Sequence, residues 1–284
     1  MNGTATVTVT VAGDAGGRYL LAPVGIQTPE TTPLGFAVEG ADFRLTGESE
    51  TGQMAALIAP AREPVILTYA VADGPGPGYP EALFAPRDNR FTRPAAALAD
   101  DARNLAETAG GGAAGIAAIV NHVGQKFRYA HPEVRFNDGA DAVPHLACGL
   151  TEGSCVDINT YLIACLRAAG YEAGYVTGYF FPAEKNGTCD DMHCWVVTRH
   201  GGRVEAWDIA HHLKLGTRTV QPGLNPKPGT RVAVGHSMGL TFPALGIADL
   251  KLLAEPVWVD AEGGTAAAEV TIRLERSEVL ARTG

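Results

Sequence analysis

A cysteine at the predicted start of a helix is the first residue of this sequence that could do chemistry. Ser154 has the character of an N-cap, Asp157 follows three residues later as in a capping box, and Gly170 ends the apolar pattern. Cys155 is therefore expected at the first helical position. There the helix dipole and unpaired backbone N–H groups favour the thiolate, so we predict a lowered pKa and a nucleophilic thiol. The alternative is a small buried hydrophobic residue, as most free cysteines are.

A predicted β-hairpin supplies a base and a carboxylate. Two strand-like runs, 193–199 and 203–208, flank a turn that contains two glycines. Depending on which two residues form the loop, His193 either faces Asp208 directly or is its diagonal neighbour, with Trp195 in the facing position. Both registers put the imidazole and the carboxylate on one face of the hairpin. Only an odd loop or a bulge would separate them.

These three residues have the types that a nucleophile–base–orienter triad needs. Asp208 would fix the tautomer of His193, His193 would take the thiol proton, and Cys155 would attack a carbonyl carbon. The chemistry would be acyl transfer through an acyl-thioester. Each residue also has a structural alternative, because a strand histidine is often a satisfied core residue and Asp208 could simply begin a turn.

A zinc site is the competing interpretation of the same region. Cysteine and histidine are the ligands that zinc prefers, but their spacing here fits no standard zinc pattern. We therefore predict no metal and no cofactor, and we expect His211 and His212 in a loop at the rim of a cleft. The side chains that could offer ligands are Cys189, His193, Cys194, His211 and His212.

The elements that would position the triad fall into two predicted domains. Residues 1–75 begin with alternating Thr and Val and continue with strand-like runs between turns, which is typical of a small antiparallel β domain. A Pro/Gly-rich linker is expected at 76–92 and a catalytic domain at 93–284. Further elements are expected as helices at 94–108 and 113–127, and as strands at 171–181, 203–209, 230–234, 257–259 and 268–274.

Composition limits the class of partner and the compartment. The formal net charge is −9 and no Lys/Arg cluster is present, so nucleic acid is not expected as a partner. No run of about 18 apolar residues predicts a membrane span, and the first residues lack the pattern of a signal peptide. The chain has 5 cysteines, an odd number, which argues against a disulfide framework. We therefore expect a cytoplasmic enzyme without membrane contact.

The order of these motifs resembles the transglutaminase-like superfamily. The resemblance covers roughly residues 93–210, and it implies an α+β, papain-like fold behind an N-terminal β domain. A helix bearing the cysteine would pack on an antiparallel sheet bearing the histidine and the aspartate. It also implies a Cys-His-Asp triad at Cys155, His193 and Asp208, with the N–H of Cys155 binding the oxyanion. The motifs are 153–157 (GSCVD), 166–179 (LRAAGYEAGYVTGY), 193–195 (HCW) and 207–208 (WD).

The superfamily includes peptidases, amidases, cross-linkers and amide-forming or ring-closing enzymes, so the resemblance leaves the reaction open. We predict hydrolysis of an amide or peptide bond in a small-molecule or peptidic acyl substrate. A biosynthetic acyltransferase or cyclase is the alternative. A catalytically silent binding or scaffold protein is the alternative of another class, and the intact triad argues against it. We expect the cleft to be lined by Trp195, Tyr179, Phe180, Phe181 and His211.

Overall fold

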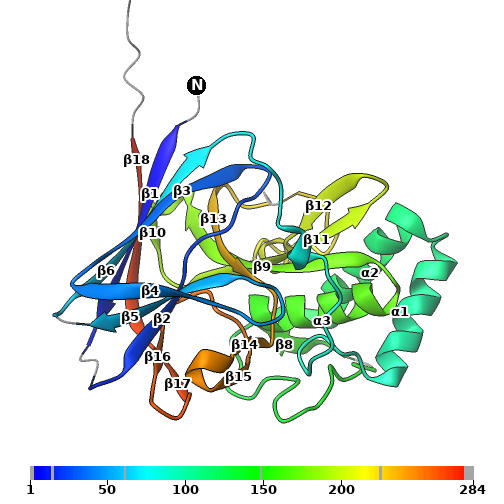
Figure 1. Ribbon diagram of the computed structural model, residues 1–284. Helices are drawn as coiled ribbons and strands as arrows, with labels where there is room; N and C mark the ends of the chain where they lie inside the picture. The colour runs from blue at the N-terminus through cyan, green and yellow to red at the C-terminus, as the bar shows by residue number, and fades with distance from the viewer. Residues whose placement is uncertain (1–2, 14–15, 61, 148, 224–225, 278–284) are drawn as a thin grey trace, which may run out of the picture.

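The protein has an α+β fold, as predicted. The computed structural model describes residues 3–277 apart from 14–15, 61, 148 and 224–225. A β sandwich lies at one end of the molecule and a sheet covered by helices at the other (Figure 1). Within the described residues, no helix has the length and apolar character needed to cross a membrane.

The sandwich consists of two antiparallel sheets with a shared hydrophobic core. Strand β1 (Thr4–Ala12) shows the cause, because its alternating sequence buries Val7 and Val9 against Leu20 and Ile58 of the other sheet. One sheet has the order β10 (Thr188–Cys189), β18 (Glu269–Ser277), β1, β6 (Val65–Asp73), β3 (Thr31–Glu39). The other has the order β17 (Thr265–Ala267), β16 (Val257–Val259), β2 (Tyr19–Pro23), β5 (Met54–Pro60), β4 (Ala41–Gly47).

Both ends of the described chain contribute to the sandwich. Strand β18 pairs with β1 along its whole length, from Thr4 opposite Ser277 to Ala12 opposite Glu269, and β16 pairs with β2 (Figure 1). Residues 257–277, which the sequence analysis assigned to the catalytic domain, therefore lie in the sandwich.

The second part of the molecule is a four-stranded antiparallel sheet with helices on one face. Its order is β12 (Arg203–Trp207), β11 (Met192–His200), β9 (Glu172–Pro182), β13 (Gly229–His236). The core between sheet and helices combines Leu162 and Ile158 of the third helix with Tyr175 and Val196 of the sheet. The helices are α1 (Ala96–Thr108), α2 (Gly112–Lys126) and α3 (Cys155–Ala168).

The opposite face of this sheet packs against the segment that connects the two parts. Trp195 and Val176 lie in one cluster with Tyr79, Leu83 and Phe84 of that segment. The sheet is therefore buried on both faces. The remaining elements are η1 (Glu81–Leu83), β7 (Phe127–Tyr129), β8 (Thr151–Gly153), η2 (Ala183–Lys185), α4 (Ile209–Lys214), β14 (Leu240–Phe242), η3 (Pro243–Leu245) and β15 (Ile247–Leu250).

One sequence-based expectation for these elements needs correction, and one strand was missed. The strand expected at 203–209 ends at Trp207, because Asp208 caps helix α4 instead of continuing the strand. Strand β2 was not expected, because its buried residues Leu20, Leu21 and Ala22 are consecutive and give no alternating pattern.

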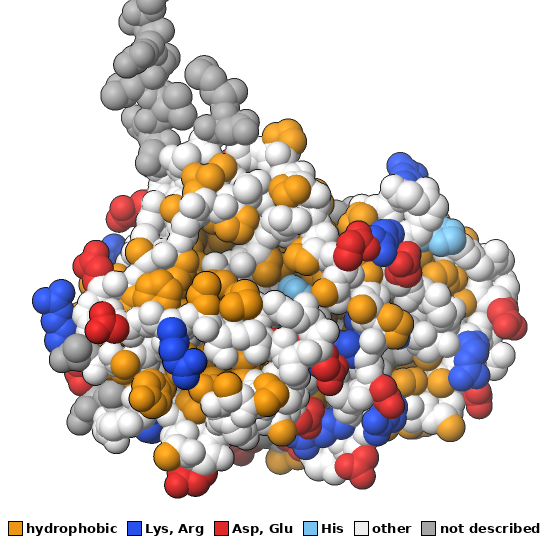
Figure 2. All heavy atoms as spheres, in the orientation of Figure 1, with side chains coloured by type: hydrophobic (Ala, Val, Ile, Leu, Met, Phe, Trp, Pro, Cys, Tyr) orange, Lys and Arg blue, Asp and Glu red, His pale blue; other side chains and the backbone are white. Residues whose placement is uncertain are grey.

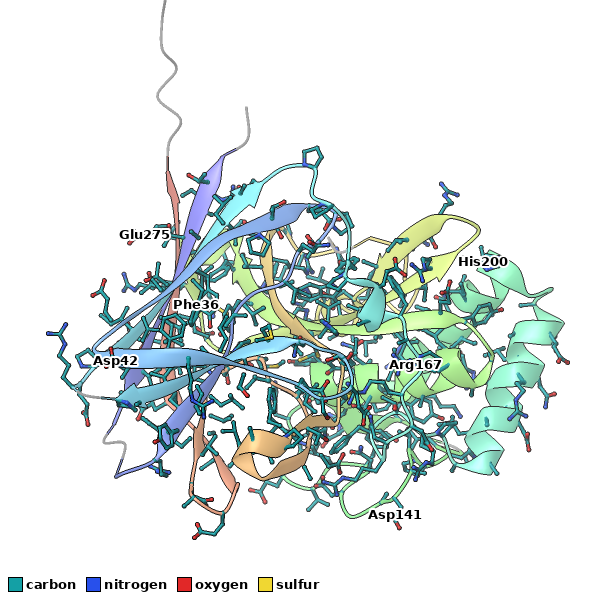
Figure 3. The ribbon with its side chains drawn as sticks, in the orientation of Figure 1. Phe36, Asp42, Asp141, Arg167, His200 and Glu275 are labelled. Carbon is teal, nitrogen blue, oxygen red and sulfur yellow. The ribbon has the colours of Figure 1, made fainter. Side chains whose placement is uncertain are left out.

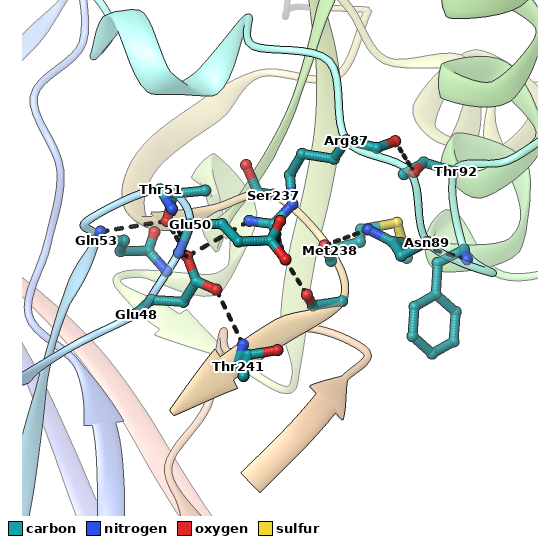
Figure 4. A network of polar contacts seen from close by, with 12 residues as sticks. Glu48, Glu50, Thr51, Gln53, Arg87, Asn89, Thr92, Ser237, Met238 and Thr241 are labelled. Atoms are coloured by element: carbon teal, nitrogen blue, oxygen red, sulfur yellow. Dashed lines mark hydrogen bonds and ion pairs between the residues drawn. The ribbon is translucent and has the colours of Figure 1, made fainter. Parts of the chain in front are cut away.

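A buried polar network joins the sandwich to residues 238–241, which lie just before and within β14 (Figure 4). Arg87 donates to the carbonyl oxygen of Gly239 at 2.7 Å, and Glu48 accepts from the backbone N–H of Thr241 at 3.0 Å. Asn89 donates to the carbonyl oxygen of Met238 at 3.0 Å. These contacts fix the sandwich relative to the helical part.

On the outside, exposed hydrophobic side chains belong mainly to the sandwich. Figure 2 shows hydrophobic side chains gathered over this part of the surface, with charged groups more frequent elsewhere. Leu34 of β3, Phe43 and Leu45 of β4, and Met54 of β5 are among the exposed ones.

Candidate active site

Helix α3 begins at Cys155, as the sequence predicted. Ser154 is the N-cap, and its backbone N–H donates to Asp157 Oδ2 at 2.8 Å in a capping box. Gly153 is required just before, since a Cβ there would come within 2.9 Å of the Phe127 ring. Local sequence therefore fixes the thiol at the first turn of the helix, where Cys155 is 5% exposed.

The β11–β12 hairpin follows the second of the two expected registers. His200 pairs with Arg203 across the two turn glycines, and Figure 3 shows His200 at the tip of the hairpin. Continuing the same pairing past the end of β12 places Asp208 opposite Trp195 and diagonal to His193. No bulge intervenes between the paired residues, so the imidazole and the carboxylate share one face.

The structure brings the three predicted triad residues together. His193 Nε2 lies 2.8 Å from Asp208 Oδ2. The His193 ring also interacts with the thiol of Cys155. Because Asp208 engages Nε2, the nitrogen that remains for the sulfur is Nδ1. Asp208 is fully buried, and its other oxygen caps α4 by accepting from the backbone N–H of His211 at 3.0 Å.

The electrostatic environment favours a charged His193–Asp208 pair. Burial alone lowers the pKa of His193, but the charge and hydrogen bond of Asp208, with the Cys155 contact, raise it to about 9. Burial likewise opposes ionisation of Asp208, yet His193 and His211 hold the pKa of that carboxyl well below its usual range. Asp208 therefore stabilises the imidazolium that His193 becomes when it takes a proton.

The expectation of a lowered pKa for Cys155 is wrong. The neighbouring Cys194 thiol and burial raise the pKa of Cys155, whereas His193 acts in the opposite direction. Sequence reasoning considered only the helix start and did not place Cys194 beside it. Cys194 is held there by Asn159, one helical turn after Cys155, whose Nδ2 donates to the Cys194 carbonyl oxygen at 3.0 Å. The thiolate of Cys155 therefore depends on the imidazolium next to it.

Arg231 was missed by the sequence analysis altogether. It lies on β13, and its Nη2 donates to Asp208 Oδ2 at 2.7 Å and approaches His211 Nδ1 at 2.8 Å. No local sequence pattern predicts this contact, because it joins residues 23 positions apart through the pairing of β13 with β9.

His211 and His212 differ from the expectation of loop residues at a cleft rim. Both lie in helix α4 and are buried. The His211 ring stacks on that of His193, with centroids 4.2 Å apart and planes 6° from parallel. His212 Nδ1 lies 2.7 Å from the Asp208 carbonyl oxygen. Because Asp208 caps α4, His211 and His212 lie in a helix whose side chains are buried, and not in an exposed loop.

The five residues expected to line the cleft separate into two groups. Phe180 lies beside the His193 and His211 rings, with its centroid 4.4 Å from that of His211. Tyr179 and Phe181 instead pack into the core of the sandwich. They do not line a cleft, because the end of β9 extends from the four-stranded sheet into the core of the sandwich.

A cavity of about 560 Å³ lies beside Arg231, and its lining does not include Cys155, His193 or Asp208. Trp195, which is two residues from His193 on the same face of β11, lines it together with Arg231. The sandwich contributes Glu30 and Thr31 to the opposite wall. The cavity therefore lies between the two parts of the molecule.

The zinc interpretation does not fit the arrangement. Cys194 packs into the core beneath α3, and the Cys189 thiol donates to the Asp191 carbonyl oxygen at 2.9 Å, so the cysteine and histidine ligands do not converge. His193, Asp208 and His211 do lie together. However, the guanidinium of Arg231 already donates to the same carboxylate oxygen and would repel a metal ion there.

Residues 98–207 match the sequence model of the transglutaminase-like superfamily. The matched segment contains Cys155 and His193 and ends one residue before Asp208. No curated protein matches the chain significantly.

Solved structures provide a second comparison. A protein of Cytophaga hutchinsonii, described as a candidate cysteine protease, is similar with a TM-score of 0.55 at 13% identity, over 97% of this chain and 91% of that chain. The periplasmic domain of TgpA from Pseudomonas aeruginosa matches with a TM-score of 0.39 at 13% identity, over 75% of this chain and 90% of that chain. At this identity the first likeness shows a shared fold.

Proposed function

Starting from the transglutaminase-like core at residues 98–207, we propose that this protein is a thiol-dependent enzyme that hydrolyses amide or peptide bonds. One observation carries the proposal. Cys155 begins a helix in contact with His193, whose Nε2 is 2.8 Å from the buried carboxylate of Asp208. The nucleophile thus contacts the base, and the base contacts the group that orients it.

In the first half of the reaction, His193 takes the proton of the Cys155 thiol. The thiolate attacks the carbonyl carbon of the substrate, and the carbonyl electrons move to the oxygen. The backbone N–H of Cys155, at the first position of α3, has no acceptor within the helix and can bind this oxyanion. Asp208 stabilises the imidazolium throughout.

In the second half, the imidazolium of His193 gives its proton to the leaving amine, and the C–N bond breaks. The acyl group remains on the Cys155 sulfur as a thioester. A water molecule then gives a proton to His193 and attacks the carbonyl carbon of the thioester. The C–S bond breaks, the acid is released, and His193 returns the proton to the Cys155 sulfur.

The choice of water as acceptor is supported by the fold shared with the candidate protease of Cytophaga hutchinsonii. Peptides are accordingly the proposed substrate class. Transfer to an amine would use the same acyl-thioester, and it differs only in which nucleophile is held near the sulfur.

A peptide library in water enriched in ¹⁸O tests the proposal. Hydrolysis predicts new C-terminal carboxyl groups that carry ¹⁸O, detected by mass spectrometry, and their loss in Cys155→Ala. Cys165→Ala is the matched control, because Cys165 is a buried thiol of the same helix that packs in the core. Cleavage that persists in Cys155→Ala, or new carboxyl groups that carry no ¹⁸O, would contradict hydrolysis by this thiol.

A further inference from the structure

Asp208 Oδ2 is contacted by three side chains, which is more than a histidine-orienting carboxylate needs. Its distances are 2.8 Å to His193 Nε2, 2.9 Å to His211 Nδ1 and 2.7 Å to Arg231 Nη2. All four side chains are almost completely buried, with that of Arg231 6% exposed. A permanent cation therefore sits inside the proposed catalytic cluster.

The charge of Arg231 bears on the protonation state of His211. The guanidinium Nη2 donates to Asp208 Oδ2 at 2.7 Å and lies 2.8 Å from His211 Nδ1. A positive charge on the His211 ring would face this guanidinium, so the contact favours a neutral ring. Burial, which lowers the pKa of His211 to about 4 despite the contact with Asp208, agrees with this assignment.

The neutral ring of His211 has a defined place in a column of flat groups. It stacks on His193 at 4.2 Å on one side and contacts Phe180 at 4.4 Å. The guanidinium of Arg231 lies 4.7 Å from the centre of the Phe180 ring. A neutral aromatic face next to His193 attracts the imidazolium that forms during catalysis. The column also prevents the His193 ring from turning away from the sulfur.

We propose that Arg231 and His211 are positioning residues of this thiol site: Arg231 directs the Asp208 carboxylate toward His193, and His211 holds the His193 ring by stacking. The proposal rests on the proposed thiol chemistry and deepens it. Neither residue touches the reacting atoms in this account, because both act through the orientation and charge of the Asp208–His193 pair.

The charge of Arg231 has a measurable consequence. A nearby cation lowers the pKa of every group around it, because it favours the thiolate of Cys155 and disfavours the imidazolium of His193. Removing that cation should raise the pKa of both groups, by about one pH unit or more for a buried charge. A purely structural role for Arg231 would reduce reactivity without moving either titration.

The other charged and titratable groups in and around the Cys155–His193 pair are the same in all the Arg231 variants. They come from the start of α3, from β7, from the residues before and within β11, and from the start of α4. They are Cys155, Tyr129, Asp191, Cys194, Asp208 and His211.

The experiment is the pH profile of Cys155 alkylation by iodoacetamide, resolved by peptide mass spectrometry. We expect Arg231→Met to shift the profile to higher pH by about one unit or more, and Arg231→Lys, which keeps the charge, to stay close to the wild type. If Arg231→Met does not fold, Arg231→Gln removes the charge while keeping a donor and tests the same shift. An unshifted profile in a folded, uncharged variant overturns the role of Arg231.

His211 is tested in the same assay. His211→Phe retains a flat ring against His193, so it should keep much of the reactivity that His211→Ala loses. Equal loss in both variants overturns the stacking role.

His193→Ala separates the failure of this inference from failure of the proposed function. If its Cys155 profile equals that of the wild type, the thiol does not depend on His193, and both proposals are wrong. If His193→Ala changes the profile and the Arg231 variants do not, only the positioning role is wrong.

Discussion

Glu48 and Asp208 are both buried carboxylates with an arginine beside them, but their partners differ in kind. Glu48 accepts from the backbone N–H groups of Thr51 at 2.6 Å and Thr241 at 3.0 Å, and it lies 3.5 Å from Arg87 Nη1 (Figure 4). These donors cannot change their protonation. The charge of Glu48 is therefore fixed, and it holds two segments of backbone together.

Asp208 is held by side chains that can change. Its Oδ2 contacts the rings of His193 and His211 as well as Arg231. A proton that arrives at His193 is stabilised by this carboxylate and can leave again. Burial beside an arginine therefore does not by itself indicate function, whereas a buried carboxylate shared by imidazoles is placed to support proton transfer.

The largest expected effect is on kcat, which should depend on Asp208 and not on Glu48. Asp208→Asn should lower kcat by about 10²–10⁴-fold, because His193 loses the partner that fixes its tautomer and stabilises its imidazolium. Glu48→Gln should leave kcat of the folded enzyme unchanged. Steady-state kinetics on both variants test this, and an equal loss of kcat in the two would remove the distinction.

The second effect is on stability. Arg87→Met leaves the Glu48 charge buried without its cation, so we expect the free energy of unfolding to fall by about 3–5 kcal/mol. Urea unfolding measures the change, with kcat of the folded fraction as the control. A stable variant with impaired catalysis would assign Arg87 to the active site instead.

The third effect distinguishes histidines in the two regions by pH. Burial lowers the pKa of His211 and of His236 to about 4, from about 6.5 in the unfolded chain. The unfolded chain binds these protons first as the pH falls. The stability supplied by the neutral rings is therefore complete above about pH 6.5 and is lost between pH 6.5 and 4. The pKa of His193 is instead raised, to about 9, so the stability that its imidazolium supplies is lost as the pH rises through 9.

Unfolding in urea at pH 7 and pH 5 checks this expectation. His211→Gln and His236→Gln should each reduce the acid-induced loss of stability by about 1–2 kcal/mol. The His236 ring contacts Ser237 Oγ at 2.9 Å and no triad residue, so only the His211 variant should also change catalysis. An unchanged pH dependence in both variants would show that neither ring is held neutral.

The smallest effect concerns the exposed member of the network. Glu50 pairs with Arg87 at 3.1 Å, but its side chain is 61% exposed. Solvent screens such a pair, so Glu50→Ala should change the free energy of unfolding by less than about 1 kcal/mol. A larger loss would mean that Arg87 depends on Glu50 more than on the buried Glu48.

The sequence predicted the parts of the site that depend on neighbouring residues. The capping box placed Cys155 at the start of α3, and the period of two in the hairpin placed His193 and Asp208 on one face. Residues far along the chain gave no such pattern. Arg231 reaches the site through the pairing of β13 with β9, and Cys194 through the packing of β11 on α3.

The fold shows the same division. The alternating run in β1 predicted a half-buried strand, and the structure confirms it. Its pairing with β18, at the other end of the described chain, could not be predicted, because strand partners are selected by tertiary packing and leave no local signal. The domain boundaries proposed from composition remain a prediction.

Acylation of Cys155 with the help of His193 is the step on which the proposed function depends. The most direct test is rapid mixing with p-nitrophenyl acetate, followed by acid quenching and mass spectrometry of the intact protein and its peptides. We predict a burst of p-nitrophenolate and an acetyl group on Cys155, both lost in Cys155→Ala and strongly slowed in His193→Ala. An acetyl group on another residue, or an unchanged burst in Cys155→Ala, would contradict the claim.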